Sequence, residues 1–473
     1  MTYLPHTAFI DPRGGNRGEI RELFAGVLDL VIDHLASAAA GTPSPAIESQ
    51  PEFGLIPDEP LPIGQILERV STLIRQPRNL AHPGYIGNLE SMPTTMSMIA
   101  ALLMVATRSN MLAEEMSPFL TRVEPPVMRW FASRFGLGRD SGGGLLAGGT
   151  LANLQALTTA RNVRLGTHEK GVCSRSRSPV IFASEVAHSS LQKSVMVMGL
   201  GTSAVIGVRA DENSRMDVDD LRRQVRKSLD SGRQEPFCVV ATAGTTITGN
   251  IDPLSEIASV AKEFGLWLHA DAIYGGALMF SPHYSRRLRG IELADSITLN
   301  LHKWLYSGLI SSMVLFRDFG QLEKHFRIAA PYMSAGQSVP NLGEYSLQGS
   351  RQADIIGLLL SLQHIGCVGF AELVEERMQL GAALRAKLRE TGVARFTGEM
   401  DTNVTCFRPH PRCARQDLEQ LQEALVRNAG VCLTSPAYRG ESWLKAVILN
   451  PYTTMATVDG LVETFTAHCL SGS

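Results

Sequence analysis

The chain has 473 residues, and its 44 lysine and arginine residues nearly balance its 46 aspartate and glutamate residues. This balance argues against a nucleic-acid surface or a polybasic membrane patch, because both need clustered positive charge. The hydrophobic fraction of 44% is sufficient for a large buried core, and a net charge of −2 is too small for a disordered chain. The length alone predicts two or three domains.

The seven cysteines are scattered, and no two have the C-x-x-C spacing of a zinc or redox site. This pattern is typical of reduced thiols, so we expect a cytoplasmic protein. The N-terminus lacks the basic patch and apolar run of a signal peptide. The most apolar stretch, Met96–Ala106, is shorter than the roughly 20 residues that a membrane-spanning helix requires. We therefore expect no membrane segment.

Residues Glu19–Leu35 place apolar side chains at helical spacing, which predicts a helix with one apolar face. A proline-rich segment follows from Gly41 to Pro62, and prolines at this density favour an extended arm. A helix separated from the rest of the chain by such an arm lacks local apolar surface to cover it. We therefore expect it to dock on a second copy of the chain, in a homodimer.

Short β-rich stretches alternate with helical patterns from about Gly142 to Phe316. The expected strands are Pro179–Ser184, Ala204–Val208, Phe237–Thr242, Leu266–Asp271, Asp295–Leu299 and Ser312–Phe316. Two intervening helices have recognisable starts: Asp217 is the expected N-cap of a helix to Leu229, and Pro253 is the expected first residue of the next. This alternation predicts an α/β fold with a central, mostly parallel sheet flanked by helices.

The rest of the chain predicts a smaller unit. The expected helices are Arg351–Ile365, Phe370–Leu388 and Gln416–Asn428, and the expected strands are Asn403–Arg408 and Trp443–Leu449. This mixture indicates a small C-terminal α+β domain. We accordingly predict an N-terminal helical arm and dimerisation segment over residues 1–95, a large domain over 96–368 and the small domain over 369–473.

A glycine-rich turn, Gly148-Gly149-Thr150, leads into a helical pattern that continues to Arg164. Glycines let the backbone approach a phosphate, the start of a helix offers unpaired N–H groups, and Thr150 adds a hydroxyl. Such turns are also common structural features of α/β folds. This motif alone therefore does not identify a phosphate site.

The segment His269-Ala270-Asp271 ends the strand that is expected to begin at Leu266. An aspartate at the C-terminal end of a parallel strand lies at the edge where α/β sheets bind ligands. A helix cap and a buried ion pair are alternatives. A metal site with His269 and Asp271 as ligands is another, although the sequence offers no third ligand nearby.

Lys303, in Asn300-Leu301-His302-Lys303-Trp304, follows the next strand. The apolar neighbours Leu301 and Trp304 would desolvate its amine and lower its pKa, leaving some free amine for Schiff-base formation. A solvated lysine at the end of a strand is the alternative. Together, the three motifs offer a phosphate cradle, a carboxylate and a lysine, which are the parts that a pyridoxal phosphate (PLP) enzyme requires.

The sequence resembles the group II PLP-dependent amino-acid decarboxylases of fold type I, the family of aromatic-amino-acid, glutamate, cysteine sulfinate and diaminobutyrate decarboxylases. The resemblance spans most of the chain, from Phe9-Ile10-Asp11-Pro12 to Asn450-Pro451-Tyr452-Thr453-Thr454, and His302-Lys303-Trp304 is a highly specific part of it. It implies a homodimeric lyase whose large domain binds PLP and which converts an L-amino acid to an amine and CO2. The alternatives are another PLP-dependent lyase reaction, oxidative deamination to an aldehyde, and a catalytically silent relative.

The resemblance also implies roles for individual residues. Lys303 would hold the cofactor aldehyde as a Schiff base, Asp271 would pair with the ring nitrogen, and His188 would stack on the ring. Thr246 would face the phenolic oxygen of the ring. Tyr332, in a mobile loop, would protonate the substrate α-carbon. The residues that would hold the phosphate are Gly149, Thr150, Asn300 and His302.

The resemblance gives a candidate substrate pocket made of His82, Tyr85, Asn88, Asn110, Leu112, Tyr332, Glu344 and Lys445, with Asn110 and Leu112 supplied by the partner chain. Leu112 stands where aromatic-substrate members have a stacking phenylalanine. Asn110 adds an amide that an aromatic substrate would leave unpaired, at a cost of about 1–3 kcal/mol. We therefore expect a polar or aliphatic substrate rather than tyrosine, tryptophan or DOPA.

Two further positions depart from the family pattern. Lys445 replaces an arginine that binds the carboxylate of acidic substrates, and an ammonium cannot reproduce the bidentate fork of a guanidinium. This departure argues against glutamate or cysteine sulfinate as the substrate. Ile273 stands where the family has a small alanine against the cofactor, so its bulk would tilt the ring or narrow the pocket.

Overall fold

The computed structural model describes residues 4–45, 51–54, 56–329, 339, 341–413 and 416–470. The chain forms two compact units, of which the first comprises residues 1–87, 411–434 and 450–473 and the second comprises residues 88–410 and 435–449. The first unit thus joins N-terminal and C-terminal segments that the sequence analysis placed in different parts. The predicted three-domain division stays a prediction.

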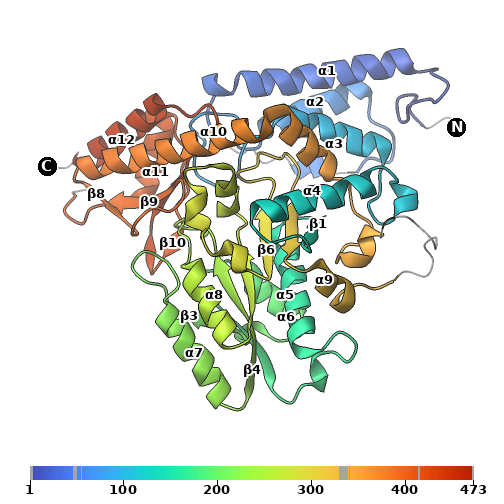
Figure 1. The fold of residues 1–473 in the computed structure, drawn as a ribbon. Helices are drawn as coiled ribbons and strands as arrows, with labels where there is room; N and C mark the ends of the chain where they lie inside the picture. The colour runs from blue at the N-terminus through green and yellow to red at the C-terminus, as the bar shows by residue number, and fades with distance from the viewer. Residues whose placement is uncertain are drawn as a thin grey trace. The chain divides into compact units, whose positions relative to one another are not determined.

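The second unit contains a seven-stranded sheet with the strand order β1-β7-β6-β5-β4-β2-β3 (Figure 1). Its strands are β1 (Gly142–Leu146), β2 (Ser178–Ser184), β3 (Val205–Val208), β4 (Gln234–Thr242), β5 (Trp267–Asp271), β6 (Ser296–Asn300) and β7 (Ser312–Phe316). Parallel pairing joins β3, β2, β4, β5 and β6, whereas β7 is antiparallel to both β6 and β1. The predicted α/β fold and all six predicted strands are confirmed.

The sequence analysis missed β1, because three successive glycines have a low strand propensity. The structure explains one of these glycines. A Cβ atom on Gly143 would lie 2.0 Å from the carbonyl oxygen of Val314 in β7. Only a residue without a side chain allows this close approach of the two strands.

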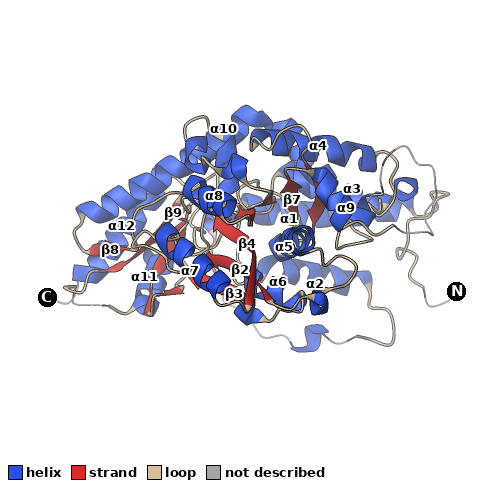
Figure 2. Cartoon of the chain, turned by 60° about the horizontal axis from the view of Figure 1, so that its bottom comes forward, coloured by secondary structure: helices blue, strands red, loops and turns tan. Residues whose placement is uncertain are grey.

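Helices cover both faces of the large sheet (Figure 2). The α-helices of this unit are α3 (Thr95–Thr107), α4 (Leu120–Arg134), α5 (Gly149–Leu165), α6 (Ser190–Val197), α7 (Val218–Asp230), α8 (Leu254–Glu263), α9 (Phe319–His325) and α10 (Ile355–Glu390). Its 3₁₀ segments are η3 (Glu114–Met116), η4 (Val172–Ser174), η5 (Thr202–Ala204), η6 (Gly275–Phe280), η7 (Ser285–Leu288), η8 (Ile291–Leu293) and η9 (Leu342–Tyr345).

Two apolar cores form on opposite faces of this sheet because successive strand residues point to opposite sides. In β2, Phe182 packs in the core that includes α4, α7 and α8, whereas Ile181 packs in the core that includes α5 and α6. In β4, Val239 packs in the core with α4, α7 and α8, and Val240 packs in the core with α5 and α6. The sheet is therefore buried on both faces, which leaves its strand ends as the places for a site.

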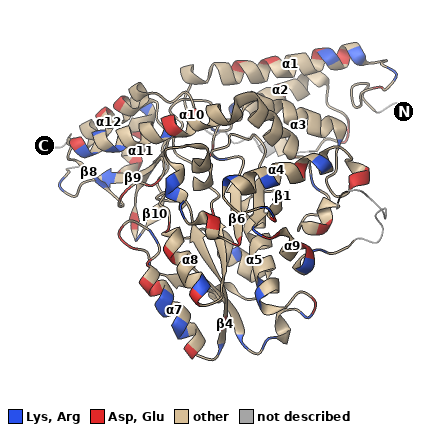
Figure 3. Ribbon diagram, viewed as in Figure 1, with Lys and Arg blue, Asp and Glu red and all other residues tan. Residues whose placement is uncertain are grey.

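The predicted helix starts are partly confirmed. The Asp217 side chain accepts a hydrogen bond from the backbone N–H of Asp220 at 2.9 Å, as expected of an N-cap. The prediction for Pro253 is wrong by one position, since α8 begins at Leu254 and Pro253 precedes it. In α7, acidic residues stand near the two ends and basic residues stand between them (Figure 3), and Arg223 pairs with Asp220 within this helix.

Helix α10 combines the two helices predicted over Arg351–Ile365 and Phe370–Leu388. Gly366, with φ of +72°, interrupts the helical geometry between them. The predicted start is wrong, because Arg351 precedes the helix and pairs with the buried carboxylate of Glu124 at 2.6 Å.

By length and composition, α10 is also the one described helix that is long and apolar enough to cross a membrane. Core helices of soluble proteins pass the same test. Here the break at Gly366 interrupts the helix, and α10 packs against α3 and the strand β9 (Val404–Pro409). The expectation that the chain has no membrane segment overlooked this helix and stays a prediction.

A three-stranded antiparallel sheet completes the second unit, with the order β12-β9-β8. Its other strands are β8 (Ala394–Phe396) and β12 (Leu444–Val447), and β10 (Ala437–Tyr438) pairs with β11 (Glu441–Ser442) nearby in the chain. The two strands predicted for the C-terminal part are confirmed as β9 and β12. Their register places Lys445 opposite Cys406.

The first unit contains four α-helices, namely α1 (Arg17–Ala36), α2 (Ile63–Arg75), α11 (Leu418–Ala429) and α12 (Met455–Leu470), and the 3₁₀ segments η1 (Ala38–Ala40) and η2 (Pro51–Gly54), all within its described residues. The predicted helices at Glu19–Leu35 and Gln416–Asn428 are therefore confirmed. Residues 46–50 and 55 of the proline-rich segment lie outside the described residues.

Candidate active site

A cavity of about 210 Å³ lies where several strands of the large sheet end. Thr242, Asp271 and Asn300 are the last residues of β4, β5 and β6, and all three line the cavity. The complete lining comprises Gly149, Thr150, His188, Thr242, Gly244, Thr246, Asp271, Ile273, Tyr274, Asn300 and Lys303. Of the predicted cofactor-binding and catalytic residues that the structure describes, all but His302 line this cavity, and Tyr332 lies outside the described residues.

Lys303 is the amine of this cavity. Burial lowers its pKa from 10.5 to about 8, although the carboxylate of Asp271 opposes this shift. The ammonium of Lys445 lowers the pKa of Lys303 further. A pKa near 8 leaves a useful fraction of uncharged amine at neutral pH. The sequence analysis expected this lowered pKa from the apolar residues that flank Lys303.

Asp271 is the carboxylate of the cavity, and its side chain is held from two directions. Its Oδ2 accepts a hydrogen bond from Asn153 Nδ2 at 3.0 Å, and its Oδ1 accepts one from the backbone N–H of Ile273 at 3.2 Å. These two bonds fix the carboxylate at the end of β5. The alternative of a helix cap is thereby excluded, since the next segment, η6, begins only at Gly275.

The alternative of a metal site at His269 is also excluded by its partners. The two ring nitrogens lie 2.9 Å from Ser296 Oγ and 3.1 Å from Asn153 Oδ1. Burial lowers the pKa of His269 to about 4, so the ring is neutral. Since both nitrogens are engaged by protein atoms, His269 supports its neighbours and is not free to bind a metal.

His188 also lines the cavity, and burial lowers its pKa, which favours the neutral ring. The backbone N–H of Ser190 donates to His188 Nδ1 at 3.1 Å. A neutral imidazole with one fixed nitrogen is suited to lie against a flat ring, as the resemblance implies for this residue.

The first turn of α5 forms one end of the cavity. Gly148 precedes it with φ of +93° and no side-chain cap, so the first N–H groups of the helix are available to an anion. A Cβ atom on Gly149 would lie 2.6 Å from Ile273 Cδ1 and 3.0 Å from Asn300 Oδ1. The backbone of Gly149 therefore forms a tight cradle that a side chain would fill.

His302 supports this cradle from behind and is absent from the cavity lining. Its Nδ1 lies 3.1 Å from the carbonyl oxygen of Ser311, which can only accept, so Nδ1 carries the proton. Its Nε2 then accepts from Asn300 Nδ2 at 3.3 Å. These bonds give His302 a role in orienting Asn300, and its predicted contact with the phosphate stays a prediction.

These residues fit PLP. The N-terminal turn of α5 suits its phosphate, Lys303 suits its aldehyde, and Asp271 suits its ring nitrogen. The hydroxyl of Thr242 lines the cavity, is buried and has no hydrogen-bond partner within the described part of the chain, so a bound group would satisfy it. When bound, PLP supplies an electron sink for the electrons released at the substrate α-carbon.

We predict that Gly149→Ala weakens PLP binding at least about tenfold, or about 1.4 kcal/mol, because the new methyl group fills the cradle. Fluorescence titration of the apoprotein with PLP measures this change. Ile273→Ala in the same chain should recover part of the affinity by clearing the nearer contact. Gly207→Ala is the matched control, since a Cβ atom there meets nothing within 4 Å. Unchanged PLP affinity in Gly149→Ala would contradict the cradle.

Lys445 lies behind the cavity and is not part of its lining. Its side chain is buried, and Nζ donates to the carbonyl oxygen of Thr246 at 3.4 Å. The cross-strand neighbour Cys406 makes a similar bond from Sγ to the carbonyl oxygen of Ile247 at 2.9 Å. The two side chains therefore hold the loop that carries Thr246, and the structure does not bring Lys445 to the predicted pocket.

We predict that Lys445→Met raises the pKa of Lys303 above about 8, because a like charge that disfavours its ammonium is removed. Uptake of PLP by the apoprotein needs the uncharged amine, so the pH midpoint of the uptake rate should move upward. Stopped-flow absorbance measures this rate. Lys193→Met, at an exposed position, should leave the midpoint unchanged. A lower or unmoved midpoint in Lys445→Met would refute the coupling.

The structure corrects the argument made from Asn110. Its Nδ2 donates to Ser350 Oγ at 3.1 Å, and its Oδ1 accepts from the backbone N–H groups of Leu112 and Arg351 at 3.0 and 3.3 Å. The amide is therefore satisfied within its own chain and does not depend on the polarity of a substrate. The expectation against aromatic substrates loses this support.

The other predicted pocket residues are dispersed. Glu344 accepts a hydrogen bond from Arg327 Nε at 2.7 Å, so the two residues form an ion pair. Asn88 and Leu112 are half-buried in the second unit and do not line the cavity. His82 and Tyr85 belong to the first unit, and Tyr332 lies outside the described residues. Their pocket roles stay predictions.

Three residues of the site were missed by the sequence analysis. Thr242 ends a predicted strand, so its position at the ligand-binding edge was a usable signal. Tyr274 follows the aspartate motif and stacks on Trp304 with ring centroids 5.2 Å apart. Asn153 lies five residues after Gly148, but nothing in the sequence indicates that its amide reaches Asp271.

Comparison with known proteins places this site in a family. Residues 49–410 match the model of the pyridoxal-dependent decarboxylase conserved domain. The chain is 31% identical over 471 residues to L-2,4-diaminobutyrate decarboxylase of Rhizobium meliloti (strain 1021), covering 95% of this chain and 92% of that protein. It is 26% identical over 456 residues to the aromatic-L-amino-acid decarboxylase of Bacillus atrophaeus, covering 92% of each.

A solved structure, that of mouse CSAD in its apo form, superposes with a TM-score of 0.87 at 25% identity, covering 96% of this chain and 99% of that one. The strand-end lysine and aspartate, the glycine cradle and the family match all point to the same chemistry. The chain therefore belongs to the pyridoxal-dependent decarboxylase family, and it is a PLP-dependent amino-acid decarboxylase.

Proposed function

We propose that the protein removes the α-carboxyl group of an L-amino acid with a short polar or basic side chain, and that L-2,4-diaminobutyrate is the first candidate. The observation that carries this proposal is a cavity that joins Lys303, Asp271 and His188, in a chain that aligns along 95% of its length with a diaminobutyrate decarboxylase.

The residues of the cavity have different roles in the proposed reaction. Lys303, with its lowered pKa, has an uncharged amine available to hold the cofactor aldehyde. Asp271 would hold a proton at the ring nitrogen of bound PLP, which would strengthen the pull on electrons from the α-carbon. His188 would lie against the ring and keep water from it. The acid that returns a proton to the α-carbon is, from the family resemblance, Tyr332.

The test is a panel of L-amino acids offered to the purified holoenzyme, with CO2 and the amine product measured together. The panel contains diaminobutyrate, aspartate, glutamate, cysteine sulfinate, tryptophan and DOPA. We expect kcat/KM for diaminobutyrate to exceed the others at least about tenfold, which corresponds to about 1.4 kcal/mol of transition-state discrimination. A higher value for an acidic or aromatic substrate would overturn the proposed substrate class. Aldehyde and peroxide without amine would overturn decarboxylation to the amine.

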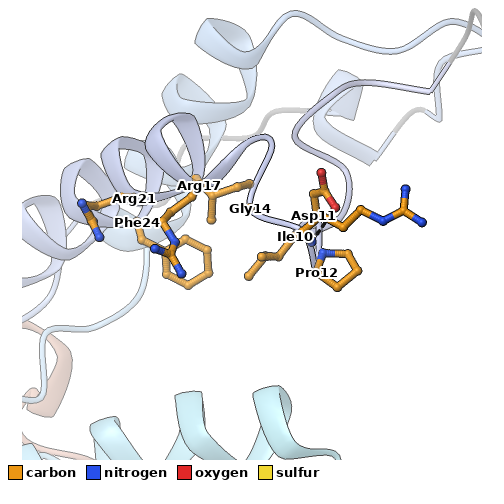
Figure 4. Close-up of a pocket in the computed structure, with 9 residues that line it drawn as sticks. Ile10, Asp11, Pro12, Gly14, Arg17, Arg21 and Phe24 are labelled. Carbon is orange, nitrogen blue, oxygen red and sulfur yellow. Dashed lines mark hydrogen bonds between the residues drawn. The ribbon is translucent and has the colours of Figure 1, made fainter.

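We also infer a homodimer from the surface of the first unit. Along α1, Phe24, Leu28 and Ile32 are 48%, 57% and 52% exposed. A second group of apolar side chains, Ile10 and Pro12, lies beside Phe24 at an open pocket that Arg17 and Arg21 flank (Figure 4). Apolar surface of this extent on a helix favours burial against another protein surface, and a second copy of the chain is the partner that the family resemblance implies.

Light scattering at micromolar concentration tests the dimer. We expect twice the mass of the chain for the wild type and a shift toward the monomer for a Phe24→Asp, Leu28→Asp double variant. Val197→Asp, at an equally exposed apolar residue of α6, is the matched control and should keep the dimer mass. A monomeric wild type would contradict the inference.

A further inference from the structure

One side chain connects the aspartate and the histidine of the cavity. Asn153 lies in the first part of α5 and is fully buried. Its Nδ2 donates to Asp271 Oδ2 and to Ser190 Oγ, both at 3.0 Å. Its Oδ1 accepts from Thr298 Oγ1 at 2.9 Å and lies 3.1 Å from His269 Nε2. All four hydrogen-bonding positions of the amide are therefore used.

The orientation of this amide is fixed by the Asp271 carboxylate, which can only accept and therefore requires the Nδ2 donor. The indole N–H can only donate, and it donates to Ser296 Oγ at 2.8 Å. Asn153 Oδ1 then faces His269 Nε2 and can only accept, so Nε2 carries the ring proton and Nδ1 accepts from Ser296 Oγ at 2.9 Å. Because His269 is neutral, its single N–H lies on Nε2 and points to Asn153 Oδ1.

The opposite orientation of the amide is excluded by the same carboxylate. A reversed amide would place Oδ1 beside the carboxylate of Asp271, where two acceptors would face each other. It would also place the amino group beside His269 Nε2–H, where two donors would meet. The N–H of Asn153 therefore always faces Asp271.

The second donor bond of Asn153 leads to His188. Ser190 Oγ accepts from Asn153 Nδ2, and the backbone N–H of Ser190 donates to His188 Nδ1 at 3.1 Å. One amide thus braces the carboxylate that meets the ring nitrogen and the turn that orients the ring-stacking histidine. Neither Asn153 nor the His269 ring behind it lines the cavity.

We propose that Asn153 is a positioning residue for the cofactor ring. Its amide group holds the Asp271 carboxylate directly and, through Ser190, the turn that carries the His188 ring. This inference rests on the PLP cofactor of the family and is independent of the proposed substrate. Its test therefore needs no substrate.

The test compares two variants of Asn153 by PLP titration and by the pH dependence of the visible absorbance of the bound cofactor. Asn153→Asp keeps an acceptor for Thr298 and His269 but sets an oxygen against Asp271. Asn153→Leu keeps the volume and removes all hydrogen bonds. We expect both to weaken PLP binding at least about tenfold. We also expect both to raise the pH midpoint of the visible band by about one unit, because ring-nitrogen protonation is less supported.

The matched control is Asn162→Asp. Asn162 is a buried asparagine on the same helix whose amide bonds His325 and Thr167, outside the cavity. It should leave the midpoint unchanged and PLP affinity within about twofold. Wild-type affinity and midpoint in a folded Asn153 variant would overturn the proposal. If neither variant folds, Thr298→Val decides, since it removes one donor to Oδ1: an upward shift of the midpoint supports the proposal, and an unmoved midpoint overturns it.

Discussion

The Lys303→Ala variant is expected to lose at least about 10³-fold in kcat, which corresponds to about 4 kcal/mol of transition-state stabilisation. Lys303 is the amine in the cavity lining, and burial lowers its pKa to about 8, so no other lining residue can replace it as a nucleophile. Steady-state production of CO2 measures the loss. The PLP content of the purified variant, after dialysis, should fall as well.

A chemical measurement identifies the lysine directly. Borohydride reduction of the wild-type holoenzyme should fix the cofactor on the peptide that contains Lys303, as found by mass mapping. Lys445→Met is the matched control, because it removes the other buried lysine near the cavity and should leave the adduct on Lys303. An adduct on any other lysine, or colourless protein after PLP addition, would refute the assignment.

Most of the large sheet could be predicted from the sequence because its strands are short apolar runs between amphipathic helices. Residues Pro179–Ser184 and Ser312–Phe316 illustrate this, since every described residue of these stretches is buried. The edge strand β1 could not be predicted, because its glycines are selected by the close approach of β7 and not by strand propensity. Likewise, Arg351 lies before α10 and pairs with Glu124, a contact between residues far apart in the chain that the sequence does not reveal.

The sequence also indicates some residues of the candidate site and not others. Asp271, Asn300 and Lys303 could be predicted, because the ends of parallel strands meet at one edge of a sheet and the residues at those ends share a site. The amide of Asn110 could not be assessed from the sequence, because hydrogen bonds to Ser350 and to the backbone of Leu112 and Arg351 already occupy it. Lys445 likewise donates to the Thr246 carbonyl, and its pocket role stays a prediction. A single sequence does not reveal which polar groups are already satisfied by tertiary contacts.

Asp271→Asn is expected to lower kcat by about 10²–10³-fold while the protein stays folded. The substitution keeps the shape of the side chain and removes the negative charge that would face the protonated ring nitrogen. Two unit charges 4 Å apart at an effective dielectric constant of 20 interact by about 4 kcal/mol, which sets the scale of the loss. Substrate affinity should change little, because the charge acts on the ring and not on the substrate side chain.

The matched control is Asp295→Asn, at a largely buried aspartate just before β6, at the other end of the sheet. Its Oδ2 accepts from the backbone N–H of Leu268 at 2.8 Å, so an amide there costs stability without touching the cavity. Asp295→Asn should therefore lower the melting temperature and keep kcat within about threefold of the wild type. If Asp271→Asn retained more than a tenth of the wild-type kcat, the ring nitrogen would not depend on this carboxylate, and its place at the end of β5 would need another explanation.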